Sequence, residues 1–167
     1  MANFIKRLFQ SRSLKAVQKA KRSEFVPLNR AKSLAIVFNN ENNELEEVLN
    51  YIKNSPAFAG CKCHYYTYNK EDINWYGKPL PLYIKELSQY SYDITIDISD
   101  GRDYSINYIL SSISSKFTIG SSYTQKNFCD MIIAKSIDNL ENDSEYSSAE
   151  QIHRIQSIIQ YLQTIQS

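Results

Sequence analysis

Strand-type and helix-type hydrophobic patterns alternate along most of this 167-residue chain, and no other feature constrains its fold as strongly. Residues 33–38 and 92–98 are short runs rich in branched aliphatic side chains, which is typical of strands buried on both faces. Each run precedes a segment whose apolar residues recur at helical spacing. Because strands that alternate with helices need crossover connections, the pattern predicts a mostly parallel sheet with helices on both faces.

The pattern predicts about five strands and four helices. The expected strands are residues 33–38, 61–68, 92–98, 117–120 and 129–134. The expected helical stripes are Leu45, Val48, Leu49 and Ile52; Leu82, Ile84 and Leu87; Ile106, Ile109, Leu110 and Ile113; and Ile152, Ile155, Ile158, Ile159, Leu162 and Ile165. Residues 71–78 are expected to be irregular or a short edge strand. We therefore expect one Rossmann-like three-layer α/β domain over residues 31–167, preceded by a basic helical arm and connector over residues 1–30.

Composition excludes several classes of protein. Hydrophobic residues make up 43% of the chain and charged residues 22%, so wholesale disorder is excluded. No apolar run approaches the roughly twenty residues that a membrane-spanning helix needs. Lys6 and Arg7 interrupt the first apolar segment, so it does not match the core of a signal peptide. The expected location is the cytoplasm, where the protein could be free or attached peripherally to the inner membrane.

The net charge of +1 conceals a strong asymmetry. The first 32 residues contain nine Lys or Arg side chains and one Glu, a net of +8. The other 135 residues contain ten basic and seventeen acidic side chains, a net of −7. This charge distribution indicates that the arm meets a negative surface, which could be a lipid headgroup, a nucleic acid or the protein's own body. The residues expected to bind it are Lys6, Arg7, Arg12, Lys15, Lys19, Lys21 and Arg22.

Four apolar residues of the arm lie on one side of a helical wheel: Phe4, Ile5, Leu8 and Phe9. The leading interpretation is a non-enzymatic interaction module whose arm docks on an anionic membrane face or on a protein partner. On a membrane, these apolar side chains would enter the interface while the basic ones meet the headgroups. Binding of RNA or the ribosome through phosphates is an alternative.

The cysteines predict free thiols and no metal site. Cys61 and Cys63 alternate on an expected strand and point to one face, which is a poor geometry for a mutual disulfide. The group formed by these two residues and His64 lacks the usual spacing of zinc ligands. With Cys129, the chain has three thiols, as expected for a reducing compartment.

Ligands of open parallel sheets bind beyond the carboxyl ends of the strands, and three carboxylates fall there. Asp97 stands near the end of the strand at 92–98, Asp100 lies in the loop after it, and Glu41 follows the first strand. They could serve a small transferase or hydrolase that binds a sugar or nucleotide-like ligand, with Asp97 as a base or hydroxyl acceptor. Alternatively, Asp97 accepts hydrogen bonds from the Gly101 and Arg102 amides and stabilises the turn.

No nucleotide cofactor is expected. The loop at residues 39–43 contains no glycine, so it cannot cradle a pyrophosphate as a dinucleotide-binding loop does, and no phosphate-loop lysine is present.

Aromatic residues are concentrated around the second expected strand and the loop after it. They are Tyr65, Tyr66, Tyr68, Trp75 and Tyr76. Such a group could stack on bases or sugars, cover a sheet edge or form a surface for a partner.

Two resemblances extend this interpretation. Residues 92–100, the helix after them and residues 116–120 are similar to a stretch in the N-terminal half of bacterial heptosyltransferases, where a strand ending in aspartate precedes a helix and a short Lys-x-x-x-Gly strand. That resemblance implies half of a two-domain GT-B glycosyltransferase fold. Most of the chain also resembles a family of short bacterial proteins with a domain of unknown function, through its basic start and residues 73–78, 93–97, 116–120 and 129–133. This second resemblance implies a Rossmann-like fold and brings no catalytic residues.

Overall fold

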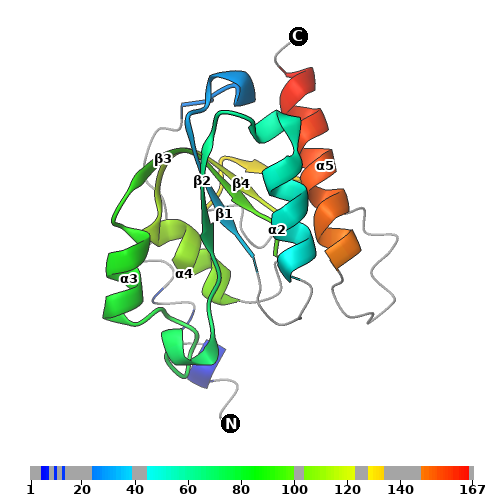
Figure 1. Cartoon of the computed structure of the whole chain (residues 1–167). Helices are drawn as coiled ribbons and strands as arrows, with labels where there is room; N and C mark the ends of the chain where they lie inside the picture. Colours follow the sequence, from blue (N-terminus) through cyan, green and yellow to red (C-terminus); the bar gives the residue numbers. More distant parts are fainter. Residues whose placement is uncertain are drawn as a thin grey trace.

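The computed structural model describes residues 5–7, 10, 13, 24–38, 45–99, 104–122, 128–133 and 148–165 (Figure 1). Within these residues the strands form one sheet, in the order β2-β1-β3-β4-β5, and every neighbouring pair is parallel. The strands are β1 (Ser33–Val37), β2 (Lys62–Tyr66), β3 (Ser91–Asp97), β4 (Ser114–Gly120) and β5 (Met131–Ile132). This is the flavodoxin-like order, in which the direction of winding reverses between β1 and β3. The predicted α/β class with a mostly parallel sheet is confirmed.

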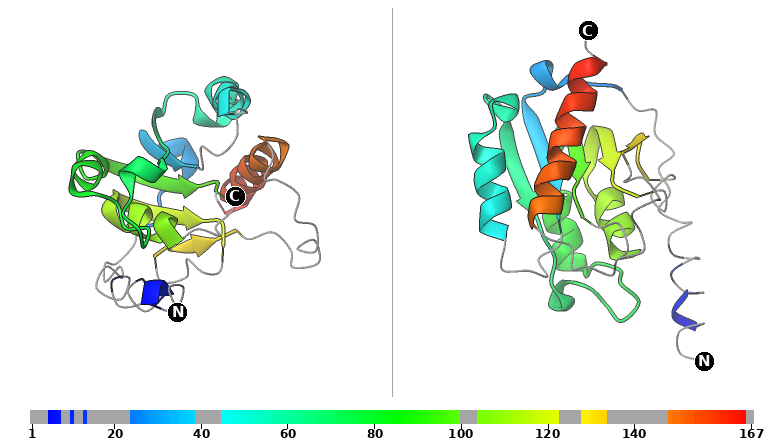
Figure 2. Two further views of the ribbon diagram at one scale, coloured as in Figure 1. Left: turned by 90° about the horizontal axis from the view of Figure 1, so that it is seen from below. Right: turned by 90° about the vertical axis from the view of Figure 1, so that its right-hand side faces the viewer.

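Helices cover both faces of the sheet (Figure 2). α2 (Leu45–Asn54) and α5 (Ser148–Thr164) pack together on one face, whereas α3 (Pro81–Leu87) and α4 (Tyr104–Ser112) pack together on the other. The interior strand β1, between β2 and β3, is buried on both faces because its side chains alternate between the two cores. Leu34 and Ile36 belong to the core under α2 and α5, and Ala35 and Val37 to the core under α3 and α4.

The helical stripes agree with prediction except in α3 and at Ile165, which follows the last residue of α5 and is 46% exposed. The side chain of Leu45 lies outside what the structure describes. Ile106, Ile109 and Leu110 of α4 are buried, as expected from their spacing. In α3, however, Leu82 is 81% exposed, and Tyr83 and Leu87 are the buried residues. Residues 83 and 87 are four positions apart and share a face, whereas residue 82 is turned about 100° from residue 83. The prediction for Leu82 was therefore wrong.

Several element boundaries also differ from the predictions. The second strand ends at Tyr66, the fourth begins at Ser114, and the fifth contains only Met131–Ile132. The expected irregular segment begins with a 3-10 helix, η3 (Lys70–Asp72), and continues into a turn closed by a bridge between Ile73 and Pro79. Reciprocal capping by Asn69 and Asp72 stabilises that 3-10 helix.

The stretch before β1 packs into the core under α2 and α5. Val26 and Leu28 are buried there, and the Phe25 ring meets the Phe117 ring edge-on at 5.2 Å. The backbone N–H of Glu24 donates to the Lys116 carbonyl of β4. Residues 24–30, expected as a connector, thus contribute to the domain, and they end in η1 (Leu28–Arg30). Another 3-10 turn, η2 (Pro56–Phe58), precedes β2.

Asp93 links three strands at the amino end of the sheet. Its Oδ2 accepts hydrogen bonds from the backbone N–H groups of Lys32 and Ser33, at 2.8 and 3.2 Å. Its Oδ1 accepts one from Lys116 Nζ at 2.8 Å. The Lys116 ammonium, followed by the Lys32 amide, holds the pKa of Asp93 below its ordinary value of 3.8. The charged carboxylate therefore ties the start of β1 and β4 to β3.

The substitution Asp93→Asn should destabilise the protein in a pH-dependent way. At pH 7 we expect a loss of about 1 kcal/mol, since an amide replaces a charged acceptor of several hydrogen bonds. Because the pKa of Asp93 is lowered in the folded state, its contribution is present above the ordinary pKa and disappears as the pH falls below it. Urea unfolding at pH 7 and pH 3 measures both quantities, with the exposed Glu86→Gln as control. A loss of equal size at both pH values would contradict this assignment.

Candidate functional site

The carboxyl ends of β1 and β3 meet at the point where the winding of the sheet reverses, which is where ligands bind in folds of this kind. Val37 and Asp97, the last residues of these strands, are paired in register. Asp97 is completely buried. The other two candidate carboxylates, Asp100 and Glu41, lie outside the described residues.

Asp97 joins the ends of two strands. Its Oδ1 accepts a hydrogen bond from the Ser99 backbone N–H at 2.8 Å, and its Oδ2 accepts one from Ser121 Oγ at 2.6 Å. Ser99 and Ser121 are both buried and follow β3 and β4. Two donors thus satisfy a carboxylate that would be costly to bury unpaired. This geometry fits the expected role of Asp97 as an acceptor that stabilises the end of the strand. The donors expected for it, the Gly101 and Arg102 amides, lie outside the described residues.

Arg154 of α5 completes this arrangement. Its guanidinium Nη1 donates to the Ser99 carbonyl at 2.5 Å and to the Ser121 carbonyl at 3.4 Å. Ser99 and Ser121 therefore each donate a hydrogen bond to Asp97 and accept one from Arg154 through their backbone carbonyls. This network connects β3, β4 and α5. Nothing local in the sequence indicates Ser121 or Arg154, because both lie far along the chain from Asp97.

The described part of the N-terminal segment contacts the body of the protein. Ile5, Lys6 and Arg7 are helical and exposed, whereas Gln10 is 6% exposed. Gln10 Nε2 donates to the Tyr76 carbonyl at 2.9 Å, and the Tyr108 hydroxyl donates to the Gln10 carbonyl at 3.3 Å. Gln10 is therefore an anchor, and no feature of the sequence distinguishes it. The remaining predicted arm residues lie outside the described residues: Phe4, Leu8, Phe9, Arg12, Lys15, Lys19, Lys21 and Arg22.

The anchor depends on a tight turn over residues 74–77. The Asn74 carbonyl accepts from the Gly77 N–H, and Asn74 Oδ1 accepts from the N–H groups of Tyr76 and Lys78. Gly77 has φ +89°, a backbone conformation that residues other than glycine rarely adopt. A Cβ atom at Gly77 would lie 2.7 Å from Ser105 Oγ of α4 and 3.8 Å from Gln10 Nε2.

The aromatic residues expected to form one group are distributed over separate parts of the structure. The Tyr66 and Tyr92 hydroxyls are 2.6 Å apart in the core under α3 and α4, and Tyr92 Oη lies 2.9 Å from His64 Nδ1. Burial raises the pKa of Tyr92 and lowers that of His64, so both side chains are neutral at pH 7. Tyr65 packs against the opposite core. Trp75, by contrast, is 61% exposed.

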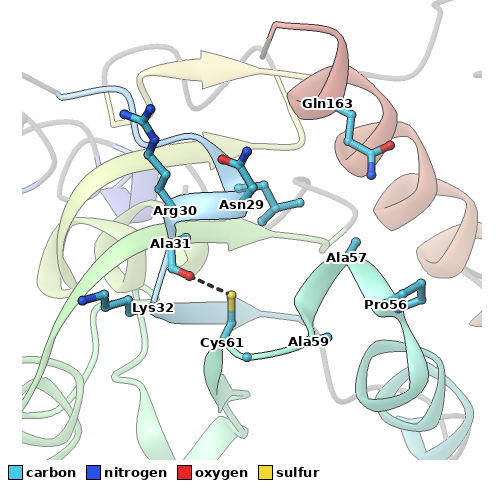
Figure 3. Close-up of a pocket in the computed structure, with 11 residues that line it drawn as sticks. Asn29, Arg30, Ala31, Lys32, Pro56, Ala57, Ala59, Cys61 and Gln163 are labelled. Carbon is cyan, nitrogen blue, oxygen red and sulfur yellow. Dashed lines mark hydrogen bonds between the residues drawn. The ribbon is translucent and has the colours of Figure 1, made fainter. Parts of the chain in front are cut away.

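A pocket of about 700 Å³ lies at the amino ends of β1 and β2 (Figure 3). Arg30 and Lys32 are on its rim and extend away from Gln163, which lies across the pocket with Ala57. Cys61 Sγ donates to the Ala31 carbonyl at 3.0 Å. Burial, and then the charge of Asp93, raise the pKa of this thiol, so it remains protonated at neutral pH and is a poor nucleophile.

The structure bears on disulfides and on metal-ligand geometry only within the residues that it describes. No disulfide joins Cys61, Cys63 and Cys129. Among the described residues, no group of three or more His, Cys, Asp or Glu side chains is arranged to hold a metal ion. Likewise, no described helix combines the length and apolar character needed to cross a membrane.

A family model described as "Family of unknown function (DUF6913)" matches residues 2–146, which is most of the chain. The chain belongs to the DUF6913 family. The expected resemblance to a family of unknown function is thereby confirmed. In this DUF6913 chain the match includes the N-terminal segment, the turn over residues 74–77 (the Trp75 turn) and the five strands of the described residues. No curated protein and no solved structure matches the chain, and the comparisons show no similarity to heptosyltransferases.

The substitution Ser121→Ala should destabilise this DUF6913 domain by about 2 kcal/mol, because it removes a hydrogen bond to a buried carboxylate. A double-mutant cycle with Asp97→Asn in urea unfolding measures the coupling between the two side chains. The control Ser88→Ala removes an exposed hydroxyl bonded to the Lys85 carbonyl and should change stability by less than about 0.5 kcal/mol. Additive effects of Ser121→Ala and Asp97→Asn would refute the proposed link.

Gly77→Ala and Gly60→Ala form a matched pair that separates backbone strain from steric contact. Both glycines have positive φ, of +89° and +86°, but only Gly77 has a neighbour where the Cβ would be placed. Gly60→Ala should cost about 1 kcal/mol in the free energy of unfolding, from the left-handed conformation alone. Gly77→Ala should cost clearly more, because buried Ser105 must also move. Equal losses in thermal or urea unfolding would show that the turn does not press on α4.

Proposed function

We propose that this chain is an α/β interaction module that docks peripherally on anionic membranes through its basic N-terminal segment. One observation carries the proposal: Gln10 is buried and bonded to the body, whereas Ile5, Lys6 and Arg7 on the same segment remain exposed. The anchor holds this part of the segment at a defined place on the domain. The cations Lys6 and Arg7 and the apolar side chain of Ile5 are thereby exposed together, where a partner can contact them.

The charge distribution supports an anionic partner. The first 32 residues have a net charge of +8 and the remainder −7, so attraction to a negative surface is concentrated in one part of the chain. Each basic residue near an anionic leaflet contributes roughly 1 kcal/mol, and the attraction decays within a Debye length. Several such residues give weak binding that salt weakens further.

Ile5 favours a membrane over a nucleic acid. It is 46% exposed and directly precedes two exposed cations, Lys6 and Arg7. An apolar side chain among cations suits the boundary between headgroups and acyl chains, where each group finds its preferred environment. Phosphate contacts to RNA would use only the cations.

The strand-end carboxylate does not lead us to propose an enzyme. A general base or a ligand-binding carboxylate must reach its substrate. Asp97 is 0% exposed, and its two oxygens are bonded to Ser99 and Ser121. This geometry supports the role of Asp97 in holding the strand ends.

Vesicle flotation tests the proposal with two charge-matched variants of the full chain. The native protein should float with vesicles of phosphatidylcholine and phosphatidylglycerol at low salt, and remain unbound with pure phosphatidylcholine or at high salt. Lys6→Gln combined with Arg7→Gln should weaken binding about 30-fold, from roughly 1 kcal/mol for each charge. Arg30→Gln combined with Lys32→Gln removes the same charge from exposed residues at the amino end of the sheet, and should have a smaller effect.

Equal losses in the two variants would show that total charge, rather than the anchored segment, drives binding. Absence of flotation by the native chain at low salt would refute membrane docking. A salt-sensitive RNA complex in a filter-binding assay would then point to the phosphate-binding alternative.

A further inference from the structure

Trp75 is the single tryptophan of the chain, and its side chain is 61% exposed. Its ring makes an edge-on contact with the Tyr76 ring at 5.2 Å, yet most of its surface faces outward. An isolated exposed apolar residue is ordinary on a protein surface. Trp75 differs because of the structure that holds it and because of its neighbours.

The turn that carries Trp75 is ordered by its own hydrogen bonds. Asn74 bonds to Lys78 in both directions: its N–H donates to the Lys78 carbonyl at 2.9 Å, and its Oδ1 accepts from the Lys78 N–H at 3.0 Å. Gly77 closes the turn with the N–H···O bond to the Asn74 carbonyl at 2.9 Å. The bridge between Ile73 and Pro79 joins the two chain segments at its base. Trp75 is therefore held out from the body by a defined turn.

The same turn holds the basic segment. The Tyr76 carbonyl, one residue after Trp75, accepts the hydrogen bond from Gln10 Nε2. Figures 1 and 2 show the dark-blue helical segment at the end of the molecule opposite η1, close to the green segment that follows β2. The exposed residues Ile5, Lys6 and Arg7 thus share an anchor with the exposed indole.

We infer that Trp75 enters the headgroup–acyl boundary of an anionic bilayer when the basic segment docks, and this inference rests on the proposed function. Indole is suited to that boundary, because its ring is apolar and its N–H can bond to headgroup or water oxygens. The neighbouring cations supply charge complementarity to the anionic headgroups. Electrostatic attraction by the cations and insertion of the Trp75 indole would then occur at the same part of the protein surface.

Because Trp75 is the only tryptophan, its fluorescence reports its own environment. When native protein is mixed with phosphatidylcholine–phosphatidylglycerol vesicles at low salt, the emission should shift to shorter wavelength. Brominated acyl chains in the same vesicles should quench it. A variant with Trp75→Phe and Tyr161→Trp moves the reporter to α5, whose last turn lines the pocket at the amino end of the sheet. Its emission should neither shift nor be quenched.

A second measurement compares affinities of two matched variants. Trp75→Ser should weaken partitioning into these vesicles about tenfold, since partial burial of an indole contributes at least the free energy of that factor. Tyr161→Ser removes a comparably exposed aromatic residue, 58% exposed, and should leave partitioning unchanged. Both positions are on the surface, so thermal unfolding of the two variants should resemble that of the native chain.

The outcomes separate this inference from the proposed function. Flotation with an unshifted, unquenched Trp75 emission, or with Trp75→Ser equal to native, would overturn insertion while leaving electrostatic docking in place. No flotation of the native chain would overturn both. Flotation with a shifted, quenched emission and a tenfold weaker Trp75→Ser would establish the turn as the apolar part of the docking surface.

Discussion

The carboxyl end of the sheet depends on one buried carboxylate. Asp97 is inaccessible to solvent and must be paired, and the Ser99 amide and the Ser121 hydroxyl provide that pairing. Arg154 then holds the carbonyls of the same two residues. The ends of β3 and β4 and the position of α5 follow from this network. A second contact, from Ser148 Oγ to Glu47 Oε2 at 2.6 Å, ties the start of α5 to α2.

The two ends of the sheet have different chemistry. At the amino end, Asp93 links the starts of β1 and β4 to β3, and Cys61 remains a protonated thiol in the lining of the pocket. At the carboxyl end, the turn that follows β2 carries the exposed Trp75, and its Tyr76 carbonyl accepts the hydrogen bond from the Gln10 side chain. The proposed docking surface belongs to this second region. There the fold presents cations and apolar side chains together, while the strand-end carboxylate is enclosed.

Much of the fold was predictable, because burial on a sheet or a helix imposes a period on the sequence. Ile94, Ile96 and Ile98 alternate and share one core, and the stripe of α4 faces the other. The prediction failed where the period is ambiguous: in the short helix α3, Tyr83 rather than Leu82 is buried. The tyrosine hydroxyl reaches the Thr67 carbonyl at 2.7 Å, so an aromatic residue that is also polar fits the interior.

The sequence by itself determined the α/β class, the separation of charge between the first 32 residues and the rest, and the importance of Asp97 as a carboxylate among isoleucines. These features follow from the hydrophobic pattern and the composition, which can be determined from the amino-acid sequence without knowing which distant residues are in contact. Only the tertiary structure decided which donors satisfy Asp97, and that Gln10 seats the N-terminal segment beside the Trp75 turn. Such contacts join residues 24 or 66 positions apart, and the pairing of distant segments depends on the packing of the whole chain.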